Sequence, residues 1–204
     1  MVPKVHFPNV IKFNQALRRG ASQAFTPVDV SLDDLAMLQY TGGTTGLAKG
    51  AMLSHGNIVA NVMQLDGFFE TFGIEAQGSV FMQPLPVYHI YAFTISMYSL
   101  KKGAHTLFIP NPRDLGSVVD AFEKYKPTVF CGLNTLFVAL CNDPRFQSLT
   151  FENLALTMSG GMALTQDAAE RWAEVTDCKV YEGYGLTETS PTATSNPGNG
   201  RQLG

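Results

Sequence analysis

Residues 104–132 read AHTLFIPNPRDLGSVVDAFEKYKPTVFCG, and this stretch contains a strand, a helix and a second strand in succession. Thr106–Ile109 and Thr128–Cys131 are short runs of apolar and β-branched residues, which is typical of buried strands. Between them, Leu115–Tyr125 has apolar residues at helical spacing, and Asp114 precedes it as an N-cap. Because a helix of this length forms a crossover connection, we predict that the two strands are parallel.

The same alternation of strands and helices continues on both sides of this stretch. Further strands are predicted at Val80–Met82, Leu154–Met158 and Val180–Tyr181, and further helices at Val87–Lys102, Asn134–Cys141 and Thr165–Val175. This order predicts an α/β fold with a predominantly parallel sheet and flanking helices. Ligands bind beyond the carboxyl ends of strands in such sheets, which directs attention to the loops at 84–89, 132–134, 159–162 and 182–188.

The part of the chain before the first predicted parallel strand has a different pattern. Ala36–Tyr40 and Ala51–Leu53 are predicted to form a hairpin, and Ser54 offers an N-cap to a helix that follows it and reaches about residue 69. Residues 1–30 show no sustained period and are interrupted by proline and glycine. We therefore expect a lead-in segment with at most one short helix, Val10–Arg19, and a single domain from residue 31 to residue 204.

The composition favours a cytoplasmic protein and excludes some partners. With 204 residues and 45% hydrophobic composition, the chain can bury roughly 70% of its unfolded surface in one core. The formal net charge of −3 gives no basic field for nucleic acid. The three cysteines match neither a zinc site nor a redox pair. Residues 1–10 do not resemble a signal peptide, and the most apolar stretch, 90–100, is shorter than a bilayer span.

The polar loop of the predicted hairpin has the composition of a phosphate-binding loop. Residues 40–50 read YTGGTTGLAKG. Glycines let backbone N–H groups point at an anion, threonine hydroxyls add donors, and Lys49 adds charge. The spacing does not match a Walker loop, because Lys49 precedes glycine and not serine or threonine. Composition alone leaves an ordinary loop tip as an equal alternative.

Three other strings contain residues suited to nucleotide chemistry. Residues 181–191 read YEGYGLTETSP, and here Tyr184 offers an aromatic face for a purine and Glu188 a hard ligand for Mg²⁺. Residues 84–89 read PLPVYH, and residues 159–163 read SGGMA. Taken singly, His89 would more often be a structural histidine and Glu188 an ordinary exposed acid.

Together and in this order, the four strings resemble the signature motifs of the adenylate-forming superfamily of acyl-CoA synthetases, luciferases and peptide-synthetase adenylation domains. Most members have serine where Gly42 or Gly43 stands and proline where Ala48 stands. These departures resemble the bacterial long-chain fatty acyl-CoA synthetase branch. The resemblance runs over nearly the whole chain, which is similar to a central part of the large N-terminal domain of those enzymes.

The resemblance implies a set of site residues. It implies ATP binding through Tyr40, Thr41, Gly42, Gly43, Thr44, Thr45, Gly46 and Lys49. It implies that Tyr184 and Gly185, with the Gly160–Gly161 turn, bind the nucleotide at the adenine, that Thr187 contacts phosphate and that Glu188 holds Mg²⁺. His89 is expected to position the substrate carboxylate or to gate the acyl pocket. Glu188, Thr187 and His89 are thus the candidate catalytic residues.

The resemblance also implies a reaction in two steps. A fatty acid carboxylate attacks the α-phosphate of ATP to give acyl-AMP and pyrophosphate, and the thiol of coenzyme A then displaces AMP. The family's ribose-binding aspartate and catalytic lysine belong after Gly204, so we expect residues 1–204 alone to be inactive. For the full-length enzyme the resemblance allows a homodimer and peripheral association with the inner membrane. Two alternatives remain open: another adenylate-forming ligase (an aryl-CoA ligase or an adenylation domain), and a non-catalytic nucleotide-binding module.

Overall fold

The computed structural model describes residues 8–41, 48–75, 77–196 and 198, and the chain divides into two compact units, residues 1–30 and 31–204. The described part of the first unit contains one helix, α1 (Phe13–Ala21). This helix begins three residues later than predicted, because the backbone of Lys12 is still extended. All described residues of this unit are exposed.

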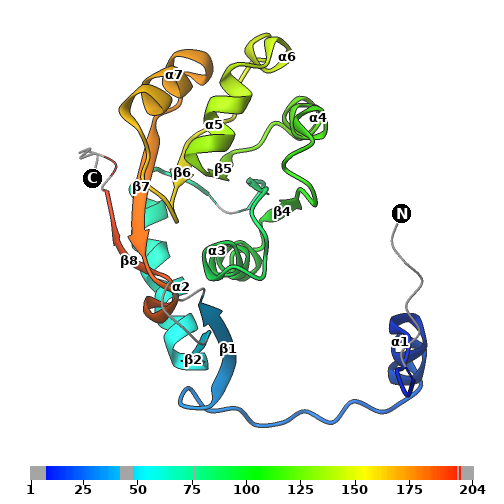
Figure 1. Ribbon diagram of the computed structural model, residues 1–204. Helices are drawn as coiled ribbons and strands as arrows, with labels where there is room; N and C mark the ends of the chain where they lie inside the picture. The colour runs from blue at the N-terminus through cyan, green and yellow to red at the C-terminus, as the bar shows by residue number, and fades with distance from the viewer. Residues whose placement is uncertain (1–7, 42–47, 76, 197, 199–204) are drawn as a thin grey trace. The chain divides into compact units, whose positions relative to one another are not determined.

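The second unit is built on a six-stranded sheet with the strand order β4-β3-β5-β6-β7-β8 (Figure 1). The strands are β3 (Val80–Gln83), β4 (His105–Phe108), β5 (Val129–Gly132), β6 (Leu156–Ser159), β7 (Val180–Gly185) and β8 (Thr192–Ser195). The first five are parallel, and β8 is antiparallel to β7. The prediction of a predominantly parallel sheet is therefore confirmed.

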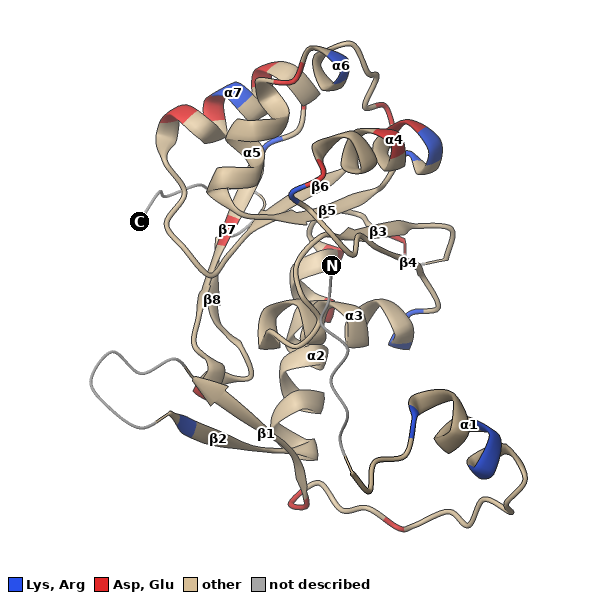
Figure 2. Cartoon of the chain, turned by 45° about the vertical axis from the view of Figure 1, so that its right-hand side comes forward, with Lys and Arg blue, Asp and Glu red and all other residues tan. Residues whose placement is uncertain are grey.

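Helices cover both faces of this sheet. One face packs against α2 (His55–Glu70) and α3 (Ile90–Lys101), and the other against α4 (Leu115–Tyr125), α5 (Asn134–Cys141) and α7 (Gln166–Thr176), with the short α6 (Pro144–Gln147) nearby. No described helix is long and apolar enough to cross a bilayer. Figure 2 shows that most charged residues lie on the helices and turns, whereas β3, β5 and β6 carry none.

Alternation along the strands explains why both faces are covered. Neighbouring residues of a strand point to opposite faces. Phe81 accordingly packs with α2 and α3, while Met82 belongs to the core under α4, α5 and α7. In β6, Leu156 faces the first core, whereas the buried Thr157 accepts a hydrogen bond of 3.0 Å from the indole N–H of Trp172 in α7. Strands buried on both faces appear in the sequence as continuous apolar runs.

The two-stranded hairpin forms as predicted, from β1 (Leu35–Thr41) and β2 (Lys49–Ser54). Helix α2 begins directly after β2. Its start is fixed by a capping box, in which the side chains of Ser54 and Asn57 each accept a hydrogen bond from the other's backbone N–H. Gln39 in β1 donates a 2.9 Å hydrogen bond to the carbonyl of Tyr88, which connects the hairpin to the loop before α3.

Near the site, two boundaries differ from the predictions, and two elements in the second unit were not predicted. Helix α3 starts at Ile90 and not at residue 87, because residues 86–89 form a turn closed by a 2.9 Å bond from His89 N–H to the carbonyl of Pro86. The segment 182–185, expected as loop, continues strand β7. Strand β8 and helix α6 were not predicted; the sequence of β8, TATS, has no apolar run, and α6 has only four residues.

Candidate active site

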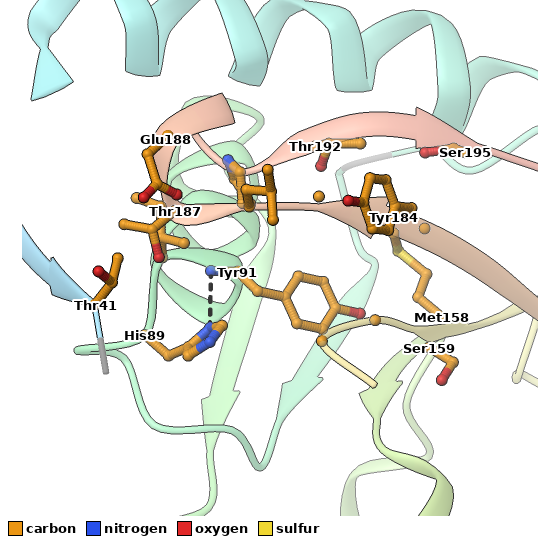
Figure 3. Close-up of a pocket in the computed structure, with 17 residues that line it drawn as sticks. Thr41, His89, Tyr91, Met158, Ser159, Tyr184, Thr187, Glu188, Thr192 and Ser195 are labelled. Carbon is orange, nitrogen blue, oxygen red and sulfur yellow. Dashed lines mark hydrogen bonds between the residues drawn. The ribbon is translucent and has the colours of Figure 1, made fainter. Parts of the chain in front are cut away.

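A cavity of about 300 Å³ lies at the carboxyl ends of β6 and β7 (Figure 3). Three of the four loops that the sequence indicates contribute to its wall, namely those that follow β3, β6 and β7. Thr41, at the end of β1, lies on the same wall as His89, Thr187 and Glu188. The position agrees with the general rule for ligand sites in parallel sheets.

The fourth loop, residues 132–134, does not line the cavity and instead supports the loop after β6. The side-chain oxygen of Asn134 accepts hydrogen bonds from the backbone N–H of Thr165, at 2.9 Å, and from its hydroxyl, at 3.1 Å. Thr165 is the N-cap of α7. Asn134 therefore fixes the end of the segment that begins at the Gly160–Gly161 turn.

His89 enters the cavity from the N-terminus of α3, where it is the N-cap residue. Its Nδ1 accepts a hydrogen bond of 3.3 Å from the backbone N–H of Tyr91 (Figure 3). A neutral imidazole that accepts at Nδ1 carries its proton on Nε2. The side chain is exposed, so Nε2 can donate a hydrogen bond to an anionic ligand.

The Gly160–Gly161 turn brings the backbone close to the cavity. A Cβ on Gly160 would lie 3.4 Å from the ring of Tyr91 and 3.4 Å from the carbonyl oxygen of Gly183. Gly161 has φ +81°, a conformation that side-chain-bearing residues rarely adopt. Both glycines line the cavity, and the backbone of Gly161 is exposed where a flat ligand can approach.

Thr187 and Glu188 lie in the turn between β7 and β8. The N–H of Leu186 contacts the carbonyl of Pro191 at 3.1 Å and the hydroxyl of Thr189 at 2.9 Å, and so closes the turn. Gly185 is necessary at its base, since a Cβ there would be 2.1 Å from the Pro191 carbonyl oxygen. Glu188 is exposed toward the cavity.

Tyr184 lines this cavity and also a second one of about 630 Å³, whose wall includes Gly161, Met162 and Glu182. Its side chain is 64% exposed. One carboxylate oxygen of Glu182 accepts a 3.2 Å hydrogen bond from the N–H of Leu164, and the other is buried without a partner among the described residues. The second cavity is therefore bounded by an aromatic ring, a glycine turn and an acceptor.

Only some of the predicted phosphate-loop residues are among the described residues. Gly42, Gly43, Thr44, Thr45 and Gly46 lie outside the described residues. The hydroxyl of Thr41 donates to the carbonyl of Lys49 at 3.3 Å, which holds the two strand ends together. Tyr40 packs across the hairpin on Gly50, and neither Tyr40 nor Lys49 is among the residues that line the two cavities.

Several wall residues were not among the candidate binding and catalytic residues named from the sequence. Tyr91 and Ser159 are buried in the inner wall, and their hydroxyls have no oxygen or nitrogen partner among the described residues. Burial raises the pKa of Tyr91 well above its usual value, so it stays protonated. The weak acceptor beside it is Cys131, whose pKa burial raises to about 12. Thr192 and Ser195 also line the wall, and they were missed because β8 was not predicted.

The described lining of the first cavity carries a single charged side chain. Glu188 is the one carboxylate among the described residues that line the first cavity, and no lysine or arginine accompanies it there. The described residues include no cluster of three or more His, Cys, Asp or Glu side chains suited to hold a metal ion. A divalent cation here would need ligands from a bound molecule as well as Glu188.

Comparisons with known proteins agree on one family. The family model described as "AMP-binding enzyme" matches residues 4–203. A long-chain-fatty-acid--CoA ligase of Haemophilus influenzae is 42% identical over 201 residues, which are 98% of this chain and 36% of that protein. The ligase of the same name from Salmonella typhimurium is 43% identical over 97% of this chain and 35% of its own length. The chain thus spans about a third of the length of these relatives.

The fold is similar to that of solved adenylate-forming enzymes. The crystal structure of ATP-bound MatB from Rhodopseudomonas palustris superposes with a TM-score of 0.78 and 32% sequence identity. The match covers 93% of this chain and 37% of that one.

Proposed function

The chain belongs to the AMP-binding enzyme family, and on that basis we propose that its cavity serves the ATP-dependent activation of a long-chain fatty acid, first to acyl-AMP and then to acyl-CoA. One observation carries the proposal: three strings that are far apart in sequence place His89, the Gly160–Gly161 turn and Glu188 around a single cavity. Relatives named long-chain-fatty-acid--CoA ligases support the choice of acyl substrate.

The nucleotide would lie across both cavities. Gly161 and the exposed ring of Tyr184 both line the second cavity, and an aromatic face suits a purine. The unpartnered oxygen of Glu182 could accept a hydrogen bond from an exocyclic amino group. The phosphates would then extend toward Thr41 and Thr187 on the wall of the first cavity, where the hydroxyl of Thr187 can donate a hydrogen bond.

Mg²⁺ fits the residues present. The described site offers one exposed carboxylate, Glu188, with the hydroxyls of Thr41 and Thr187 on the same wall. Mg²⁺ in phosphoryl-transfer sites is commonly held by one or two carboxylates together with substrate phosphates and water. When bound, it would neutralise phosphate charge. Glu188 would hold it, and Thr187 would orient a phosphate oxygen.

The protein's own contribution to the first step would be positional and electrostatic. A carboxylate oxygen attacks the α-phosphorus, the P–O bond to pyrophosphate breaks, and the displaced electron pair leaves with pyrophosphate. In the second step a thiolate attacks the acyl carbon and AMP departs. The protonated Nε2 of His89 would hold the attacking carboxylate in line. No covalent bond to the protein is needed.

The proposal is tested by carboxylate-dependent exchange of pyrophosphate into ATP, using the complete natural protein that contains this chain. Exchange with palmitate, followed by thioester formation when coenzyme A is added, is the expected result. Exchange that depends on an aryl acid or an amino acid, with none for palmitate, would favour another adenylate-forming ligase. Nucleotide binding without exchange for any acid would indicate a non-catalytic module.

The proposal also covers where the enzyme lies in the cell and how it assembles. A cytoplasmic enzyme of this kind takes a membrane-soluble substrate, so we propose peripheral association with the inner membrane, and a homodimer as the assembly. Vesicle flotation and sedimentation equilibrium test these two points separately. Failure of either leaves the assignment of the cavity unaffected.

A further inference from the structure

Two buried polar side chains outside the cavity hold the strand that follows the Thr187–Glu188 turn. Asn61 in α2 is 4% exposed, and Thr94 in α3 is 1% exposed. The side-chain amide of Asn61 donates to the carbonyl of Thr192 at 2.9 Å, and its oxygen accepts from the N–H of Thr192 at 3.2 Å. The hydroxyl of Thr94 donates to the carbonyl of Ser190 at 3.3 Å.

The contact made by Asn61 replaces a missing strand. Thr192 begins β8, which is the outermost strand of the sheet and pairs with β7 on one side through Gly185. Its N–H and carbonyl on the other side would otherwise be unpaired. A primary amide presents a donor and an acceptor side by side, so it satisfies both groups as a neighbouring strand would. An apolar residue at position 61 would bury both groups unpaired, which is unfavourable.

The same helix is joined directly to the phosphate-loop hairpin. Helix α2 starts after Ser54, the last residue of β2, and the capping box between Ser54 and Asn57 fixes that start. Asn61 follows seven residues after Ser54, a rise of about 10 Å along the helix. Strand β2 also contacts the 3₁₀ turn at Thr187–Thr189. A short, rigid element therefore connects the hairpin to the turn that carries Glu188.

We propose that Asn61 is a positioning residue that sets the place of Glu188 relative to the phosphate-loop hairpin, and so tunes how Mg²⁺ strengthens ATP binding. This proposal rests on the proposed function, because it takes Glu188 as the Mg²⁺ ligand. Asn61 is not among the residues that line the cavity and acts only through the backbone of Thr192. Groups that orient a metal ligand in this indirect way are a general feature of metal sites.

The test compares two substitutions in one helix. Asn61→Leu is close in size and removes both hydrogen bonds to Thr192. The matched control is Gln64→Ala, since Gln64 accepts the other amide proton of Asn61 at 3.1 Å and has an exposed side chain. Calorimetry on the complete natural protein gives the dissociation constant of ATP with and without Mg²⁺. The ratio of the two dissociation constants measures how much Mg²⁺ strengthens ATP binding. We expect this ratio to fall about 10-fold or more in Asn61→Leu and to be unchanged in Gln64→Ala.

A second measurement keeps the two proposals distinguishable. Hydrogen exchange should be faster in residues 187–192 of Asn61→Leu while the amides of β3 and β5 stay protected. An unaltered Mg²⁺ effect in a folded Asn61→Leu protein overturns the positioning role. If that variant does not fold, Asn61→Asp, which keeps the acceptor for the Thr192 N–H and loses the amide donors to Thr192 and Gln64, must show the same loss in smaller degree. If Mg²⁺ does not change the affinity of the wild-type protein for ATP, the proposed function itself is contradicted. Hydrogen exchange in residues 187–192 then still tests whether Asn61 restrains the turn.

Discussion

At the scale of single residues, Glu188 is the group whose charge can be tested most directly. Its carboxylate is exposed at the tip of the β7–β8 turn, and Glu188→Gln removes the charge with almost no change in shape. Because Tyr184 and the Gly160–Gly161 turn are unaltered, ATP binding without Mg²⁺ should be unchanged. Acyl-AMP formation at fixed Mg²⁺ should fall by about 100-fold, as when one preorganised electrostatic contact is removed. Pyrophosphate release at the wild-type rate would contradict the role.

Gly185 and Gly183 form a matched pair for testing the backbone of the same turn. A Cβ at position 185 would be 2.1 Å from the Pro191 carbonyl oxygen, whereas one at position 183 would have 3.7 Å to its nearest neighbour, the carbonyl oxygen of Thr194. Gly185→Ala should therefore displace the turn and lower the midpoint of thermal unfolding, with a loss of roughly 1–3 kcal/mol. Gly183→Ala should unfold close to wild type. Equal midpoints for the two variants would show that the turn adjusts freely.

At the scale of elements, Asp66 connects the two helices that cover one face of the sheet. It lies in α2 and forms ion pairs with Lys101 and Lys102 at the end of α3. Hydrogen bonds to these two lysines hold the pKa of Asp66 below its usual value of 3.8. A carboxyl whose pKa is lowered on folding stabilises the protein above its unfolded pKa, and the effect is lost as the pH falls through the folded value.

Asp66→Asn should accordingly be less stable than wild type at pH 7, by about 0.2–1 kcal/mol because the pair is partly exposed. The difference should shrink below about pH 4, where the unfolded carboxyl becomes protonated, and vanish below the folded pKa. Urea unfolding of both proteins at pH 7 and at pH 3 measures it. A difference that is the same at both pH values would mean that the effect of the substitution is not electrostatic.

The elements also show how far the sequence alone predicts this fold. Strands such as β5, with the sequence VFCG, are apolar throughout because both faces are buried, so they were recognised. Strand β8 has the sequence TATS, which contains no apolar run that would indicate a strand. Its pairing with β7 and its hydrogen bonds to the side-chain amide of Asn61 stabilise it, and the contact with Asn61 is distant in sequence. The start of helix α3 was predicted too early because Val87 is apolar, like the helix residues that follow it. In the structure, the turn closed by the hydrogen bond between His89 and Pro86 delays the start of the helix to Ile90.

The candidate site was predictable where the motif residues themselves form the wall, as for His89, Gly161 and Glu188. The sequence could not indicate how the buried side chains of the wall are arranged. Tyr91 looks like any aromatic residue of a core helix, and its hydroxyl becomes relevant only because the turn at Gly160 leaves space beside its ring. The support given by Asn134 to Thr165 is likewise a contact between segments 31 residues apart.

At the scale of the whole molecule, the last prediction concerns residues 1–204 produced by themselves. The described lining of both cavities contains two carboxylates, Glu182 and Glu188, and no lysine or arginine. ATP brings several negative charges to the site, and Mg²⁺ bound to Glu188 compensates only part of them. The developing charge at the α-phosphate would have no fixed cation from the described lining of the cavities, and loss of one such contact typically lowers the rate about 100-fold or more.

The tyrosine, the glycine turn and the exposed carboxylate are nevertheless present, so the isolated chain should bind Mg²⁺-ATP weakly and form no measurable acyl-CoA from palmitate, ATP and coenzyme A. A coupled assay measures this, with the complete natural protein as positive control and circular dichroism to establish that residues 1–204 are folded. Turnover within about tenfold of the control would correspond to a barrier difference below ~1.4 kcal/mol. Such a result would mean that the charge compensation comes from within the chain, and Lys49, at the exposed start of β2, would then be the first cation to substitute.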